Sequence, residues 1–180
     1  MKDKLLEQAK HEYSPKQRYV LLLILVPVFL IILPTTLIAL GSKIDQWLQW
    51  SPILYEPFNL ILGWLLSVAS WTFAMWSIYS QFTLGRGTPV PLMATQKLII
   101  QPPYSYCRNP MALGAIGMYL GVAILFGSMG AVVLVLLGAG CLLTYIKRIE
   151  EREMEIRFGE AYLVYKHKTP FLIPRFRKQG

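Results

Sequence analysis

Charge is scarce in this 180-residue chain and is unevenly placed. Charged residues make up 16% of the sequence and hydrophobic residues 54%, whereas soluble domains carry about 25% charged residues. No carboxylate occurs between Glu56 and Glu150. A proton-coupled exporter of four short helices needs an intramembrane carboxylate to exchange protons for substrate. The absence therefore argues against a small multidrug transporter.

Cysteine and histidine are also rare, with two of each in the chain. Cys107 and Cys141 lie in segments of different character, so they indicate no disulfide framework. A Cys/His metal site needs three or four such ligands at close spacing. Since His11 and His167 are the only histidines, the sequence predicts no metal site.

The formal net charge of +8 raises the question of nucleic-acid binding. The basic residues, however, flank apolar segments, where they act as topology signals and contact lipid headgroups. We therefore expect membrane lipids, and no nucleic acid, among the partners.

Long apolar runs predict an all-α integral membrane protein, because a helix needs about 20 apolar residues to cross a bilayer. The third and fourth runs are joined by the short turn GSMG, which forces an antiparallel helical hairpin. A charged helical extension should follow the fourth run on the cytoplasmic side. The four predicted transmembrane helices are Tyr19–Leu40, Phe58–Gln81, Met111–Phe126 and Gly130–Ile146.

Several residues suggest how these spans are built. Pro27 and Pro34 should kink the first span, which is too long for a secretory signal peptide. The loop Gly41–Pro57, with three aromatic residues, resembles an aromatic belt on the outer face. Glycines at positions 114, 117 and 121 would either admit a neighbouring helix closely or simply reflect membrane composition.

The distribution of Lys and Arg predicts the orientation. Five lie in the N-terminal tail, three in the second loop and nine in the C-terminal tail, against one in the first loop. By the positive-inside bias, both termini are cytoplasmic. We expect a single membrane domain, residues 1–180: a cytoplasmic tail (1–18), two spans (19–81) and a catalytic-type region (82–180). The tail could be a short interfacial amphipathic helix or an unstructured polar segment.

Two cytoplasmic segments could carry chemistry. The loop Phe82–Pro110 contains five prolines, so it cannot be helical throughout and should fold back as a stiff segment. Five glutamates cluster after the fourth span, where Glu151 and Glu155 would share a helix face. Unless this cluster binds a cation, the pattern is typical of a solvated, charged helix end. The GRG within the loop lacks the third glycine of a dinucleotide-binding fingerprint.

Two separated motifs carry a resemblance to a known family. QPPYSYCRNPMALG precedes the hairpin and EEREMEIRFGEAYLVYKHKTPFLIPR follows it, with GRGTPVP upstream. This order resembles the isoprenylcysteine carboxyl methyltransferases and their bacterial relatives, which are similar to phospholipid N-methyltransferases. The family form is GPY-x-x-x-R-[HN]-P, then E-E, F-G-x-x-Y-x-x-Y and V-P-x-x-x-P. The resemblance covers about residues 83–175.

The resemblance implies an S-adenosylmethionine-dependent methyltransferase in a bacterial-type inner membrane. Its acceptor would be lipid-like or prenylated: the carboxylate of an isoprenylcysteine-like substrate, or a lipid amine. Glu150 would lie near the cofactor's amino group, where a carboxylate complements the ammonium and the sulfonium. The implied cofactor-binding residues are Gln96, Lys97, Leu98, Ile99, Tyr104, Asn109, Pro110, Met111, Ala112 and Glu150. The sequence defines neither the acceptor nor the oligomeric state.

Catalytic roles are expected for Arg108 and Glu151. Arg108 could orient an anionic acceptor or reach the membrane interface as a snorkelling side chain. A carboxylate acceptor needs no base at pH 7, whereas an amine must lose a proton, with help from Glu151 or Tyr104. In the second span, Trp71, Met75 and Trp76 either line an opening for a lipid tail or face lipid.

Two positions depart from the family pattern. Ala112 stands where many members have tyrosine, and Ile146 where eukaryotic prenylcysteine enzymes have a carboxylate-binding arginine. The first departure keeps a non-catalytic membrane assembly protein open as an alternative. A nicotinamide-dependent reductase of the sterol-reductase type is the other, although it would need further amino-terminal spans.

Overall fold

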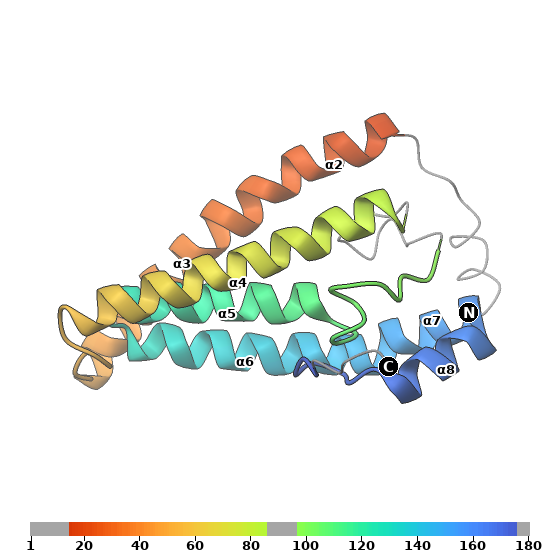
Figure 1. Ribbon diagram of the computed structural model, residues 1–180. Helices are drawn as coiled ribbons and strands as arrows, with labels where there is room; N and C mark the ends of the chain where they lie inside the picture. Colours follow the sequence, from red (N-terminus) through yellow and green to blue (C-terminus); the bar gives the residue numbers. More distant parts are fainter. Residues whose placement is uncertain (1–14, 86–96, 176–180) are drawn as a thin grey trace. The chain divides into compact units, whose positions relative to one another are not determined.

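The computed structural model describes residues 15–85 and 97–175, and within these ranges the chain is entirely helical, without a β-strand (Figure 1). This confirms the all-α prediction. The N-terminal tail, Gln96 and most of GRGTPVP lie outside the described residues. The helices are α2 (Pro15–Pro27), the π-helical turn η1 (Val28–Ile32), α3 (Leu33–Leu48), α4 (Phe58–Thr83), α5 (Pro110–Leu125), α6 (Met129–Tyr145), the π-helical turn η2 (Ile146–Glu150), α7 (Glu151–Phe158) and α8 (Glu160–Lys168).

Three helical stretches are long and apolar enough to cross a membrane: Leu23–Leu48, Phe58–Thr83 and Met129–Phe158. They contain 26, 26 and 30 residues. The apolar helix α5 has only 16 residues, which span about 24 Å at 1.5 Å per residue, against a hydrocarbon core of about 30 Å. The second span agrees with its predicted bounds almost to the residue.

The first span differs from its prediction at its carboxyl end. The helix does not stop at Leu40 but continues to Leu48, so the first half of the predicted Gly41–Pro57 loop is helical. Gln49 ends the helix in the left-handed conformation, with φ of 52°. Gly41 does not stop the helix because it packs directly against Ala131 of α6, and that contact offsets the low helix propensity of glycine.

The two prolines of the first span act through a π-helical turn between them. In η1 the Leu33 N–H donates to the Val28 carbonyl, five residues back. One residue further on, the same register would need an N–H from Pro34, which has none. The Tyr119 hydroxyl of α5 instead donates to the carbonyl of Phe29 at 2.8 Å. A neighbouring helix thus pairs a carbonyl that the proline leaves without a donor, as membrane helices require.

The chain forms two compact units that interleave along the sequence. Unit 2 comprises Leu21–Thr72 and Gly114–Leu142, and Figure 1 shows α4, α5 and α6 lying side by side in it. A Cβ built on Gly63 of α4 would lie 2.7 Å from Leu125 Cα, and one on Gly121 of α5 would lie 2.6 Å from the backbone nitrogen of Ser67. These glycines therefore bring two helix backbones together, which confirms the close-approach interpretation for Gly121.

A carboxylate closes the hairpin turn of unit 2. Asp45, in the last turn of α3, accepts hydrogen bonds from the Ser128 hydroxyl at 2.5 Å and from the Gly130 N–H at 2.7 Å. The Ser128 hydroxyl in turn accepts the Ala131 N–H at 3.0 Å, which is the N-cap arrangement for α6. The predicted hairpin of α5 and α6 is present, and α3 is tied to its turn.

Unit 1 comprises the described residues 15–20, 73–85, 97–113 and 143–175. Its elements are the end of α4, the proline-rich loop before α5, and the helices α7 and α8, which lie side by side (Figure 1). Gly159 joins these two helices with φ of 54°, a conformation that favours glycine because it has no Cβ. This reversal turns α8 and the segment after it back toward the loop.

Candidate functional site

The loop before α5 is irregular, as its prolines predict. Within residues 97–109 the chain makes turns and no helix, and Pro103 is fully buried. The Tyr106 N–H donates to the Pro103 carbonyl at 3.1 Å, and the Ser105 N–H to the Gln101 carbonyl at 3.2 Å. A loop of this kind leaves several backbone groups without regular partners. The rest of unit 1 supplies those partners.

The side chain of Arg108, a residue of this loop, attaches the loop to α8 and α7. Its Nη1 donates to the carbonyls of Lys166 and Thr169 at 2.8 and 2.7 Å. These carbonyls lie at the carboxyl end of α8, where a positive charge is favoured. Its Nε and Nη2 both donate to Oε1 of Glu151, at 2.9 and 2.6 Å. The Arg108 and Glu151 side chains are 11% and 5% exposed, so this is a buried ion pair.

Lys166 occupies the other oxygen of Glu151. The Lys166 Nζ lies 2.8 Å from Glu151 Oε2 and 2.8 Å from Glu155 Oε1. Hydrogen bonds to these two carboxylates raise the pKa of Lys166. Because one ammonium reaches both glutamates, they share a face of α7, as the i, i+4 spacing predicts. Both oxygens of the Glu151 carboxylate are therefore engaged by cations.

Backbone hydrogen bonds complete the attachment of the loop to the C-terminal segment. The N–H of Arg108 donates to the Pro170 carbonyl at 2.9 Å, and the N–H of Arg175 to the Tyr106 carbonyl at 3.0 Å. The Asn109 Nδ2 donates to the Phe171 carbonyl at 2.9 Å. We call residues 104–109 and 165–175, joined in this way, the clasp.

Tyr165 fixes the remaining end of the clasp. Its hydroxyl donates to the Tyr104 carbonyl at 2.7 Å, and both side chains are buried. The Tyr165 ring lies 6.0 Å from that of Tyr162, one turn earlier on α8. Tyr165 thus fixes the backbone of Tyr104, and the side-chain hydroxyl of Tyr104 takes no part in this contact.

Tyr104 and Gln81 form an unusual pair of polar groups. Neither the Tyr104 hydroxyl nor the Gln81 Oε1 has a hydrogen-bond partner among the described residues, although both atoms are buried. Burial raises the pKa of the Tyr104 phenol, the neighbouring Tyr165, Cys107 and Glu150 raise it further, and Gln81 lowers it. Gln81 and Glu150 are thus near enough to act on the phenol, but Gln81 does not meet it in a well-aligned hydrogen bond. Unpaired buried polar atoms are rare and call for a partner.

The structure brings most of the sequence-predicted site residues into unit 1. Arg108 and Glu151 are in direct contact, and Glu150, the last residue of η2, lies near Tyr104. Pro110, Met111 and Ala112 form the first turn of α5, with Pro110 and Ala112 buried. Ile99 is buried, Leu98 is half-buried and Lys97 is exposed. The binding and catalytic roles assigned to these residues stay predictions, and Gln96 lies outside the described residues.

Sequence reasoning assigned no role to three residues that matter here: Gln81, Tyr165 and Lys166. Gln81 is a polar amide near the end of a predominantly apolar helix, which is a usable signal. Tyr165 belongs to the F-G-x-x-Y-x-x-Y motif, but the motif does not show that its hydroxyl pairs with the Tyr104 carbonyl. Lys166 carries no signal in sequence, because the partner carboxylates come from another helix.

The comparison with protein families decides the class of protein. The sequence model for "Phospholipid methyltransferase" matches residues 58–161, more than half of the chain. The chain belongs to this family. It is therefore an integral membrane protein of a methyltransferase family, as the motifs around the hairpin predict. A comparison with curated proteins finds no match. The family match runs from α4 to the first residues of α8, so the C-terminal half of the clasp, residues 165–175, lies beyond it.

Proposed function

We propose that this family member transfers a methyl group from S-adenosylmethionine to a lipophilic acceptor, at a site beside Tyr104, Gln81 and Glu150. The observation that carries the proposal is the pair of unpaired buried atoms, the Tyr104 hydroxyl and the Gln81 Oε1. The Tyr104 hydroxyl can both donate and accept a hydrogen bond, and the Gln81 Oε1 can accept one. A polar ligand with hydroxyl and amino groups would satisfy both.

The charges near Tyr104 fit such a ligand. S-adenosylmethionine carries an ammonium and a sulfonium, and when bound it supplies an activated methyl group for in-line displacement. Glu150 is half-buried and forms no ion pair among the described residues, so its carboxylate is available to complement those positive charges. Its neighbour Glu151 is occupied by Arg108 and Lys166. The two consecutive glutamates therefore have separate tasks.

Arg108 and Glu151 are best assigned to positioning. Arg108 already makes four hydrogen bonds, two to carbonyls of the clasp and two to Glu151, and the Glu151 carboxylate is ion-paired at both oxygens. In this role they hold the loop that presents Tyr104, and alignment of the reacting groups is the main contribution a protein makes to methyl transfer. The raised pKa of the Tyr104 phenol keeps it protonated, which suits a hydrogen-bond donor and not a base.

The groups available near Tyr104 limit which methyl acceptors the site can use. A carboxylate, as in an isoprenylcysteine-like substrate, is ionised at pH 7 and needs no base. A lipid amine must first lose a proton, and Glu150 is then the available carboxylate nearest Tyr104. Half-exposed Trp76 packs edge-on against Tyr106 at 6.1 Å, so an aromatic surface of α4 adjoins the loop and could accompany a lipid tail.

We further propose four transmembrane helices with both termini in the cytoplasm of a bacterial-type inner membrane, with α5 as the third span in chain order. The distribution of Lys and Arg supports this orientation. It puts the loop before α5 and the segment after η2 on one side of the membrane, where a water-soluble cofactor can reach both.

Isothermal titration of the purified full chain with S-adenosylmethionine and its demethylated product tests the site. We expect wild type to bind both, and Tyr104→Phe and Glu150→Gln each to weaken binding by about tenfold or more, since the first removes a buried hydroxyl and the second removes the negative charge that complements the cofactor's cations. Glu160→Gln, an exposed carboxylate on α8, is the matched control and should bind as wild type. Absence of binding by wild type would overturn the proposal.

Methyl transfer to an isoprenylcysteine analogue and to phosphatidylethanolamine, measured side by side, distinguishes the two acceptor classes. Transfer to the carboxylate that is independent of pH between 6 and 8 indicates O-methylation. Transfer to the amine that rises with pH indicates N-methylation, because the amine must be deprotonated.

A further inference from the structure

The C-terminal half of the clasp borders a basic pocket that the proposed methyl transfer does not use. The pocket has a volume of about 710 Å³ and is lined by Arg108, the end of α8 and the segment that follows it. Arg108, Lys166, Lys168 and Arg175 contribute cationic side chains, and none of the described residues that line it is acidic. Its ligand should therefore be an anion.

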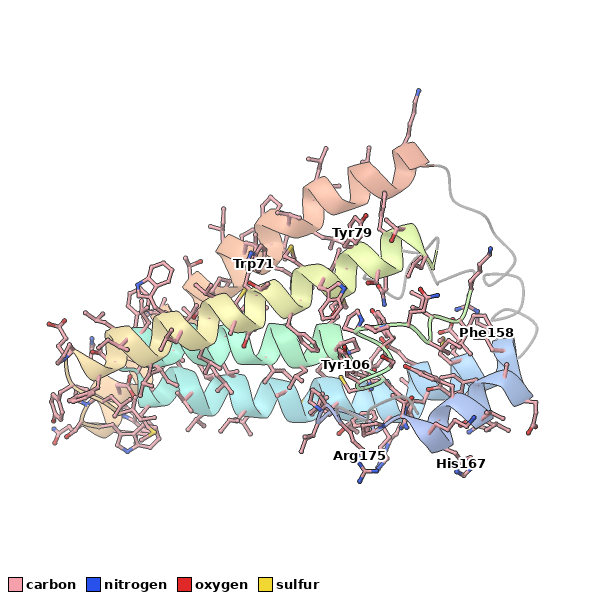
Figure 2. All side chains as sticks on the ribbon, viewed as in Figure 1. Trp71, Tyr79, Tyr106, Phe158, His167 and Arg175 are labelled. Atoms are coloured by element: carbon pink, nitrogen blue, oxygen red, sulfur yellow. The ribbon has the colours of Figure 1, made fainter. Side chains whose placement is uncertain are left out.

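Two of the four cations are available to such a ligand. Arg108 and Lys166 are neutralised by Glu151 and Glu155. Lys168 and Arg175 are exposed and form no ion pair within the described parts of the chain. Figure 2 shows the Arg175 side chain projecting outward beyond the ribbon, as does that of His167. The uncompensated positive charge thus lies at the open side of the pocket.

The pocket also adjoins the start of an apolar helix. Arg108, which forms part of its wall, precedes Pro110, the first residue of the apolar helix α5, by two positions. In the same wall Ile173 is 79% exposed, directly before Pro174. An exposed apolar side chain among basic residues is the composition of segments that lie in the headgroup region of a bilayer.

We propose that this pocket binds the headgroup of an anionic lipid of the bilayer, with Lys168 and Arg175 contacting its phosphate and Ile173 entering the acyl region. The lipid anchors residues 169–175 on the membrane surface, and these are the residues that hold the Arg108 loop. Binding of this lipid requires no cofactor.

Native mass spectrometry of the full chain in detergent, titrated with dioctanoyl-phosphatidylglycerol or dioctanoyl-phosphatidylcholine, tests it. We expect wild type to prefer the anionic lipid, and the double variant Lys168→Gln/Arg175→Gln to bind it at least tenfold more weakly, since each basic residue near an anionic surface contributes severalfold. Lys147→Gln/Arg148→Gln is the matched control: it removes two exposed basic residues of η2 that do not line the pocket, and it should retain the wild-type preference.

Two further measurements separate a lipid from a free anion. Inorganic phosphate should compete only at far higher concentration than the lipid, and Ile173→Asn should weaken lipid binding without changing competition by phosphate. Equal losses in the two double variants, no preference for the anionic lipid, or phosphate competing as well as the lipid would each overturn the proposal. Since no S-adenosylmethionine is present, these outcomes leave the methyltransferase proposal untouched.

Discussion

In unit 2 the helices meet through glycine and serine, whereas in unit 1 an irregular loop is fixed by an arginine, two glutamates and a lysine. The helices of unit 2 satisfy their own backbone groups, so what they need from each other is close contact. Backbone groups of the loop at residues 97–109 instead pair with the C-terminal segment and with the Tyr165 hydroxyl, and ion pairs among charged side chains hold the two segments together. The difference shows why small residues mark one unit and charged residues the other.

A substitution at Arg108 should have the largest effect on the charged arrangement of unit 1. Arg108→Gln leaves Glu151 buried with a single cationic partner and removes donors to two α8 carbonyls, so we expect the free energy of unfolding to fall by about 3–5 kcal/mol. Arg108→Lys keeps the charge but not the forked geometry, and should recover only part of the loss. Unfolding in mixed detergent measures both.

The matched control is Arg152→Gln, an exposed arginine on α7, for which a change within about 0.5 kcal/mol is expected. If Arg108→Gln unfolds like this control, the buried ion pair does not stabilise the clasp and the contrast between the two units fails.

In unit 2, Gly63→Ala should lower the free energy of unfolding by adding a single methyl group. The added Cβ would lie 2.7 Å from Leu125 backbone atoms, which cannot move aside as a flexible side chain would, so a loss of about 1–3 kcal/mol is expected. Gly138→Ala makes the same change in α6, where no atom lies within 4 Å of the new Cβ. It should leave stability unchanged or raise it by up to about 1 kcal/mol. Thermal unfolding curves that fail to separate the two variants would contradict the packing described for α4 and α5.

The smallest effect is expected at Tyr119. Tyr119→Phe keeps the ring but removes the donor to the Phe29 carbonyl, and hydrogen bonds between membrane helices contribute about 0.6 kcal/mol on average. Hydrogen exchange of the amides in η1 should accelerate in parallel. In the Tyr119→Phe background, Pro34→Ala restores an N–H that can pair with the Phe29 carbonyl, so it should recover the lost stability. If stability does not recover, the proposed pairing is excluded.

Much of this architecture was predictable because it depends on local composition. Apolar runs and their flanking charges predicted the helices, GSMG predicted the hairpin, and the prolines predicted a non-helical loop before α5. The error at the end of the first span has a tertiary cause: Gly41 reads as a helix breaker until Ala131 is seen against it. The resemblance assigned different roles to Glu150 and Glu151, but the ion pairs of Glu151 with Arg108 and Lys166 were hidden because those partners come from distant segments.

The sequence by itself determined that this chain is helical, belongs in a membrane and carries the motifs of a methyltransferase family, because apolar length, charge placement and motif order are properties of the chain alone. Only the tertiary structure decided that Arg108 and Glu151 face each other, and that the Tyr104 hydroxyl and the Gln81 Oε1 are buried without a regular hydrogen bond among the described residues. Those facts depend on which groups from distant segments reach one another once Gly159 reverses the chain, and a buried group's chemistry is set by the partners it meets.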